Sequence, residues 1–370
     1  MHAERFHFPA KHYLLSHSVG AQPVDYESAM ATHYRDPWRN SGSDIWDAWF
    51  EIADRFRAGV APIIGVDAKD ITAQNNVSSG VAKVLFSLPA RPGRNKIILS
   101  EDDFPTVGYA LAQGARHGYD LIFLPGGNAL ANPDHWQRAF ADDVQLICAM
   151  GVYSNSNVRA PLREIAQRAQ QSGAYTLFDI AQTAGVIPLT LEEWGADFAV
   201  GTSQKYLCGG AGAAYLYARK ETARACQPLD VGWFSHAQPF AFDIHDFQYA
   251  DGAERYTGGT PSFAPLAGAL PGQNIINDIG VDIIHEHTQR LLSRLFDAVP
   301  EGAVLSARQR SNRGAGAIIK PRVFENAVAA LRDAGIAHDA RLGGIRLSFH
   351  FYNNEADVDA VIETLTPWLE

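Results

Sequence analysis

A lysine between two apolar segments is the residue of this chain whose position most suggests chemistry. The segment FAVGTSQKYLCGGAGAAYLY, residues 198–217, places Lys205 after a strand-like run and before a glycine-rich turn. A lysine at the end of an apolar strand is poorly solvated, which lowers its pKa and frees its amine as a nucleophile. The alternative is an ordinary surface lysine in a loop, and the lysine alone does not decide between the two.

Two polar residues upstream of the lysine suit one type of reaction. A nucleophilic lysine is needed most for a Schiff base with a carbonyl, notably the carbonyl of pyridoxal phosphate. Asp179 ends the predicted strand AYTLFD, where its carboxylate could keep a pyridinium nitrogen protonated, although a helix N-cap is the simpler role. Gln182 follows three residues later and could donate to the phenolate oxygen of the cofactor.

Other predicted strand ends offer places for the phosphate, the ring and a substrate. Asn76, the backbone N–H of Val77 and Ser78 lie at a predicted helix start, which either binds a phosphate or is a plain N-cap. Phe104 lies at a similar turn and could stack on a flat ring or pack in the core. Arg346, on the predicted strand GIRLSFHFY, could grip a substrate carboxylate or be a solvated edge arginine.

Short apolar runs alternate with helical periods from about residue 52 onward. The predicted strands are ITAQN, KIILS, DLIFLP, VQLICAMG, AYTLFD, DFAVG and AAYLYAR. Such alternation indicates an α/β fold, in which helices cover both faces of a mostly parallel sheet. We expect three parts. Residues 1–50 form an irregular N-terminal segment, which packs on the small domain or on a dimer partner. Residues 51–265 form a large cofactor-binding domain, and residues 266–370 form a small C-terminal α+β domain.

Composition excludes several classes of partner. The net charge of −10 argues against a nucleic-acid partner, and no apolar run is long enough to span a membrane. The start of the sequence shows no signal peptide, and three widely spaced cysteines fit a reducing cytoplasm. His285 and His287 would point to different faces of a helix, so no metal site is expected. The chain is therefore predicted to be cytoplasmic.

In their order along the chain, these motifs resemble the class V aminotransferase family of pyridoxal-phosphate enzymes, which have fold type I. The matching segments are EDDFPT, GVIPLTLEEWGADFAVGTSQKYLCGGAG, VGWFSHAQPF, RYTGGTPS and IRLSFHFYNNEADVD. Within the family the chain resembles kynureninases most, although Gln204 stands where they usually carry a tyrosine. The resemblance implies that Lys205 carries the cofactor and that Asp179, Phe104 and Arg346 have the roles given above.

The same resemblance implies further site residues and a partner. Ser203 resembles the phosphate-binding residue two positions before the lysine. The Thr260 segment resembles a loop that reaches the active site of the other subunit, so a homodimer with active sites at the subunit interface is expected. Trp233 and His236 could contact an aromatic substrate or simply pack in the core. The loop SARQRSNRGAGA lacks the nucleophilic cysteine that a cysteine desulfurase of this family needs.

The expected function is therefore that of a pyridoxal-phosphate enzyme acting on an amino acid. Kynureninase-like hydrolysis would cleave the Cβ–Cγ bond of kynurenine to give anthranilate and alanine, with Lys205 as the base that moves the α-proton. One alternative is another class V reaction on a different amino acid, namely transamination, epimerisation or β-elimination. The other is a non-catalytic binding protein with the same fold.

Overall fold

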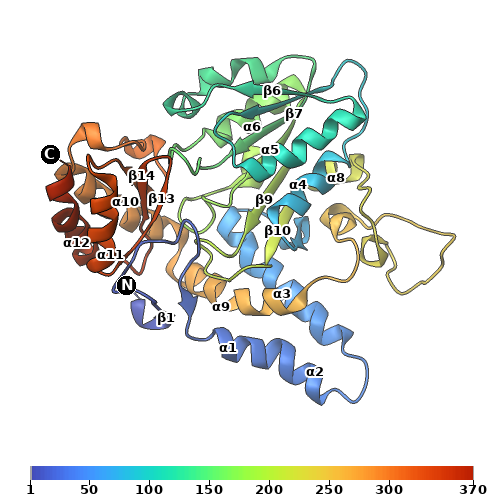
Figure 1. Ribbon diagram of the computed structural model, residues 1–370. Coiled ribbons are helices and arrows are strands. Elements are labelled where there is room, and N and C mark those ends of the chain that lie inside the picture. Colours follow the sequence, from blue (N-terminus) through green and yellow to red (C-terminus); the bar gives the residue numbers. More distant parts are fainter. Residues whose placement is uncertain (1, 370) are drawn as a thin grey trace.

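A seven-stranded sheet forms the centre of the computed structural model, which describes residues 2–369 (Figure 1). Its strand order is β4-β10-β9-β8-β7-β5-β6. Only β10 is antiparallel to its neighbours. The strands are β4 (Ile71–Gln74), β5 (Lys96–Ser100), β6 (Asp120–Leu124), β7 (Val144–Met150), β8 (Tyr175–Asp179), β9 (Phe198–Thr202) and β10 (Ala214–Ala218). The predicted α/β fold with a mostly parallel sheet is confirmed.

Helices cover this sheet because its strands are apolar on both faces; every residue of β7 and β10 is buried. In Figure 1, α4 and α5 lie in front of the sheet and α6 lies behind it. Helices α3 and α9 pack against each other beside β4. The bounds of these helices are α3 (Trp46–Ile64), α4 (Val77–Leu85), α5 (Pro105–Ala112), α6 (Leu162–Ser172) and α9 (Phe263–Ile279).

The C-terminal part has its own apolar core, which includes Leu292, Ile345 and Val361. It contains the antiparallel strands β11 (Gly316–Ile319), β13 (Asp339–Arg341) and β14 (Gly344–Ser348), with helices α10 (Val281–Ala298), α11 (Phe324–Asp333) and α12 (Glu355–Leu365). The buried residues of α9 belong instead to the core of the large sheet. We therefore propose that the small domain begins within α10, and a division at residues 265/266 remains a prediction.

The N-terminal segment connects the two cores. Strand β2 (His12–Tyr13) pairs in parallel with β12 (Ile336–Ala337) of the C-terminal part. Gly20 donates its N–H to the carbonyl of Gln204 at 2.7 Å, and a Cβ at Gly20 would lie 2.1 Å from the Lys205 carbonyl oxygen. Only glycine fits at this approach, so the segment contacts the lysine loop directly. Within residues 2–369, no helix has the length and apolarity needed to cross a bilayer.

Candidate active site

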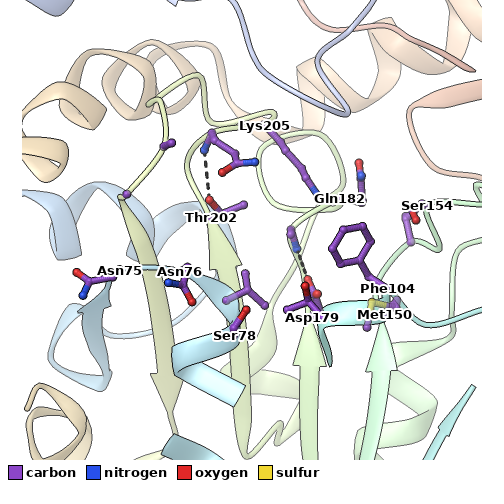
Figure 2. A pocket seen from close by; sticks show the side chains of 17 residues that line it. Asn75, Asn76, Ser78, Phe104, Met150, Ser154, Asp179, Gln182, Thr202 and Lys205 are labelled. Carbon is purple, nitrogen blue, oxygen red and sulfur yellow. Dashed lines mark hydrogen bonds between the residues drawn. The ribbon is translucent and has the colours of Figure 1, made fainter. Parts of the chain in front are cut away.

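A cavity of about 350 Å³ lies at the carboxyl ends of β7, β8 and β9 (Figure 2). In open α/β sheets this edge is the usual place for a ligand, because the loops that follow parallel strands meet there. The cavity is lined by Asn75, Asn76, Val77, Ser78, Phe104, Thr106, Met150, Val152, Ser154, Asp179, Ala181, Gln182, Thr202, Gln204, Lys205, Ala211 and Gly212. Most residues predicted from the sequence to hold a cofactor are therefore brought together.

Lys205 points into this cavity, and Figure 2 shows its side chain reaching past Gln182 toward Phe104. Its Nζ lies 5.6 Å from the centre of the Phe104 ring. Burial lowers the pKa of Lys205; Asp179 opposes this shift, while Arg346 and Arg341 add to it. A lowered pKa increases the fraction of free amine near neutral pH, so Lys205 is prepared to act as a nucleophile and as a base.

Asp179 closes the floor of the cavity at the end of β8. Its Oδ1 accepts a hydrogen bond of 2.9 Å from the N–H of Ala181. Burial raises the pKa of Asp179, and the positive charge of Lys205 counteracts this effect. The next helix, α7 (Leu191–Trp194), begins twelve residues later, so Asp179 is not the helix N-cap that was the simpler alternative. Its carboxylate faces the cavity instead.

The start of α4 forms the wall on the side opposite Phe104 (Figure 2). Asn76 is the N-cap of this helix, and its Oδ1 accepts hydrogen bonds from the N–H of Ser79 at 2.9 Å and from the Ser79 hydroxyl at 3.0 Å. Because that oxygen is occupied, the first N–H groups of the helix and the hydroxyl of Ser78 are the groups available to an anion. A helix N-terminus with free N–H groups binds phosphate well.

Ser203 does not line this cavity, contrary to the prediction from the sequence. Its side chain is fully buried beneath Gly209 and α9, where a Cβ on Gly209 would come within 2.7 Å of the Ser203 Cβ. Thr202 and Gln204 line the cavity instead. Successive side chains near a strand end point to opposite sides, so the alternation itself could have identified Thr202.

Arg346 lies beside the cavity rather than in its lining. It lines a small adjoining pocket that shares Val152, Ser154 and Gln182 with the main cavity. Its guanidinium binds both oxygens of the Asp339 carboxylate, with Nε 2.7 Å from Oδ1, and Nη1 donates to the Ser154 carbonyl at 3.1 Å. Arg346 is therefore held in one orientation at the edge of the site, and the grip on a substrate carboxylate remains a prediction.

The Asp339 carboxylate is fixed by a second residue. His17, from the N-terminal segment, donates from Nε2 to Oδ1 of Asp339 at 3.0 Å. Burial by itself would raise the pKa of Asp339, but the hydrogen bonds from His17 and Arg346 lower it well below its usual range. Asp339 therefore stays charged and aligns Arg346.

The Asp339→Asn substitution is expected to raise KM for the amino-acid substrate about tenfold, because a neutral amide no longer aligns Arg346. Steady-state kinetics of the holoenzyme measure this, and kcat and the cofactor spectrum should change much less. Asp359→Asn is the matched control, since Asp359 forms a similar two-point pair with Arg294 on the surface. An unchanged or lower KM in Asp339→Asn would contradict the assigned role.

Trp233 and His236 lie outside the cavity of their own chain, and their contact with an aromatic substrate remains a prediction. Trp233 packs edge-on against Trp46 at 5.1 Å and donates from Nε1 to the Thr260 hydroxyl at 3.2 Å. His236 bonds through Nε2 to the carbonyl of Asp246 at 2.8 Å. Their loop packs against α3 because it is rich in aromatic residues, and Thr260 lines a separate polar pocket. The role of Thr260 toward another subunit remains a prediction.

Asp103, immediately before Phe104, is a buried carboxyl group that the sequence analysis did not single out. Neither of its oxygens has a hydrogen-bond partner among residues 2–369. Burial raises the pKa of Asp103 well above its usual range, and the neighbouring Asp179 adds to the effect. The folded protein therefore favours the protonated form of Asp103 more than the unfolded chain does.

The Asp103→Asn substitution is expected to increase the free energy of unfolding at about pH 8 by on the order of 1 kcal/mol, and to have little effect near pH 4. Burial raises the pKa of Asp103 in the folded wild type above that in the unfolded chain, so stability falls as pH rises from the unfolded pKa toward the folded pKa. The asparagine does not titrate and lacks this loss. Urea unfolding at several pH values measures the difference, and a difference that does not grow with pH would contradict the raised pKa of Asp103.

The side chains of the cavity fit pyridoxal phosphate. Lys205 can bond to its carbonyl carbon, the start of α4 can bind its phosphate, and Phe104 offers a flat face to its ring. The buried Asp179 supplies the carboxylate that its pyridine nitrogen needs. No group of three or more His, Cys, Asp or Glu residues within 2–369 is arranged to hold a metal ion.

The sequence model of the family described as aminotransferase class V matches residues 24–361. The chain belongs to this family. Two kynureninases are similar to it. That of Deinococcus radiodurans is 26% identical, over 97% of this chain and 90% of the relative. That of Bacillus thuringiensis is 29% identical, over 94% of this chain and 85% of the relative. The uncharacterized aminotransferase YcbU of Bacillus subtilis is 27% identical over 95% and 92%.

Two solved structures share the fold of this chain. A mutant of the cystine C–S lyase C-DES, with glycine covalently linked to its pyridoxal-phosphate cofactor, matches with a TM-score of 0.86 and 19% identity, over 97% of each chain. The cysteine desulfurase of Thermococcus onnurineus matches with a TM-score of 0.84 and 20% identity, over 96% of this chain and 94% of that one. This member of the class V aminotransferase family has fold type I, and it is a pyridoxal-phosphate enzyme.

Several lining residues of this class V enzyme were missed from the sequence. Thr106 follows Phe104 by two residues at the start of α5, and Ser154 follows β7. Thr106 lies six residues after the end of β5 and Ser154 four residues after the end of β7, and this position in segments that follow strand ends is the signal that could have identified them. Gly212, with φ of 91°, belongs to the glycine-rich turn after Lys205 and needs glycine for this left-handed backbone.

Proposed function

We propose that this class V enzyme hydrolyses L-kynurenine, or a closely related amino acid with a side-chain ketone, at the Cβ–Cγ bond. The observation that carries the proposal is the placement of Lys205, Asp179 and Phe104 around one cavity in a chain similar to kynureninases along most of its length. The expected products are anthranilate and alanine.

Each residue has a defined task in this reaction. Pyridoxal phosphate, when bound, supplies an electron sink for the carbanion that forms at Cα of the substrate. Asp179 holds a proton at the pyridine nitrogen, and Arg346 with Asp339 orients the substrate carboxylate. Lys205 Nζ removes the α-proton, because its lowered pKa makes it a suitable base near neutral pH. Phe104 and Met150 give one side of the cavity an apolar wall.

Incubation of the holoenzyme with L-kynurenine tests the proposal, since anthranilate and alanine can each be quantified. Equal amounts of both products, formed in proportion to enzyme, would support hydrolysis. If no anthranilate forms while a keto acid or ammonia appears from other amino acids, the enzyme is a transaminase or a β-lyase. Gln204 lines the cavity where kynureninases usually carry a tyrosine, and this observation favours the second candidate.

A desulfurase reaction has less support in this chain. Cys148, Cys208 and Cys226 are all buried. Burial raises the pKa of Cys208 to about 12 and that of Cys226 to about 11. A thiol nucleophile needs exposure and a lowered pKa, so none of the three suits that chemistry.

We also propose that the enzyme is a homodimer. The loop of residues 237–248 extends away from the rest of the chain in Figure 1 and exposes Phe240, Phe242 and Ile244. Exposed apolar groups that lie together are typical of a protein contact. Light scattering on wild type and on the Phe242→Ser, Ile244→Ser double variant tests this, and a monomeric wild type would contradict it. A cytoplasmic location remains a prediction.

A further inference from the structure

A second cavity, of about 620 Å³, begins one residue beyond Gln182 and shares no lining residue with the active site. It lies between the start of α6, the end of β7 at Gly151 and the segment that contains Thr183 and Trp194. Its volume is in the range of pockets that hold small organic ligands. None of the roles assigned above uses it.

Arg159 contributes to this cavity a guanidinium without a direct partner, although the carboxylates of Glu164 and Glu193 line the cavity too. Its guanidinium forms no hydrogen bond or ion pair with any residue between 2 and 369, whereas the neighbouring Arg163 is paired with Glu193 at 3.3 Å. Burial lowers the pKa of Arg159, and the carboxylate of Glu164 offsets this only in part. A half-buried arginine without a partner lowers the stability of the folded protein, because its charge is removed from water without a hydrogen bond. A bound anion would pair with the guanidinium and offset this desolvation cost.

Two further donors at the cavity lack partners. The N-cap of α6 is Pro161, which makes no side-chain capping bond; the N–H of Leu162 donates to the carbonyl of Ala160 at 3.0 Å, and the N–H groups of Arg163 and Glu164 in the first turn remain available. The Thr183 side chain is 1% exposed, and its hydroxyl has no hydrogen-bond partner among the described residues. The guanidinium, the helix start and the hydroxyl therefore surround a site suited to a carboxylate.

The rest of the lining contains both polar and apolar residues. Trp194, Pro133, Pro161, Pro188 and Leu189 form its apolar part, and Arg163, Glu164, Thr190, Glu193 and Ser311 form its polar part. The indole face of Trp194 and the prolines around it favour a flat hydrocarbon group on that side of the cavity. We propose that this cavity binds a small aromatic carboxylate, with Arg159 pairing with the carboxylate and Trp194 packing against the ring.

Calorimetric titration of the holoenzyme with benzoate tests this site. Benzoate can also bind at Arg346, so the titration is made in the Arg346→Gln variant, with benzamide as the neutral ligand of the same shape. We expect one benzoate per chain, bound at least about tenfold more tightly than benzamide. Arg159→Gln in the same background should weaken benzoate at least about tenfold, while Arg159→Lys should retain part of the affinity.

The controls separate this site from the active site and from misfolding. Arg294→Gln, at a surface pair, should leave benzoate binding unchanged, and the melting temperature shows whether each variant is folded. No binding to the Arg346→Gln enzyme, or binding that survives folded Arg159→Gln, would overturn the proposal. The proposal does not rest on the proposed function, because turnover is measured in the wild type and benzoate binding is measured separately in the Arg346→Gln background.

Discussion

The Lys205→Ala variant is expected to lose covalently held cofactor and at least about a thousandfold in turnover, because one residue acts as both nucleophile and base. No other lysine lines the cavity, so no neighbouring amine can replace it. The absorption band of the bound cofactor and the rate of substrate consumption measure the two losses. Lys205 is already half-buried with a lowered pKa, and alanine removes this amine without adding bulk.

Lys205→Arg is the matched variant for this prediction. It keeps a positive charge near Asp179 but offers no free amine at neutral pH, so it should also lack the covalently held cofactor. Lys96→Ala, which breaks a surface pair with Asp143, should behave like the wild type. Turnover by Lys205→Ala within tenfold of the wild-type rate would contradict both roles of Lys205.

The Asp179→Asn variant is expected to bind the cofactor and yet to lose about a hundredfold or more in kcat. The reason is that a neutral amide replaces the carboxylate that faces the pyridine nitrogen of the cofactor. The amide oxygen can still accept the hydrogen bond from Ala181, so the local backbone should be preserved. Measurement of kcat at saturating substrate, with the cofactor content of each sample, separates catalysis from binding.

A second readout belongs to the same variant. Asp179 raises the pKa of Lys205, so its removal should lower the pH at which this amine becomes reactive in the cofactor-free protein. Labelling of Lys205 with an amine reagent as a function of pH reports that shift. An Asp179→Asn enzyme with nearly wild-type kcat and an unshifted labelling curve would show that Asp179 does not act on this site.

The sheet and the two residues at its strand ends could be predicted from the sequence for one physical reason. Parallel strands covered on both faces must be apolar along their whole length, so their ends are visible where polar residues begin. Asp179 is the last residue of β8, and Lys205 follows β9 by three residues. The carboxyl ends of parallel strands share one edge, which brings these two residues together.

The rest of the site follows from local strand geometry and from tertiary packing, which residue types alone do not reveal. Ser203 and Thr202 have similar chemistry, and only the local strand geometry decides which one faces the cavity. The pairing of Asp339 with Arg346 follows from the antiparallel register of β13 and β14, which places the two residues opposite each other. This pair could have been recognised from the turn at Leu342 and Gly343, whereas the contact of His17 could not.

The central claim is that Lys205 carries the cofactor, and chemical reduction tests it most directly. The purified enzyme is treated with borohydride, digested with a protease, and its peptides are analysed by mass spectrometry. The structure predicts a pyridoxyl phosphate group on the peptide that contains Lys205 and on no other peptide. A modified lysine elsewhere in the chain, or an unmodified Lys205 in protein that shows the cofactor band, would contradict the account.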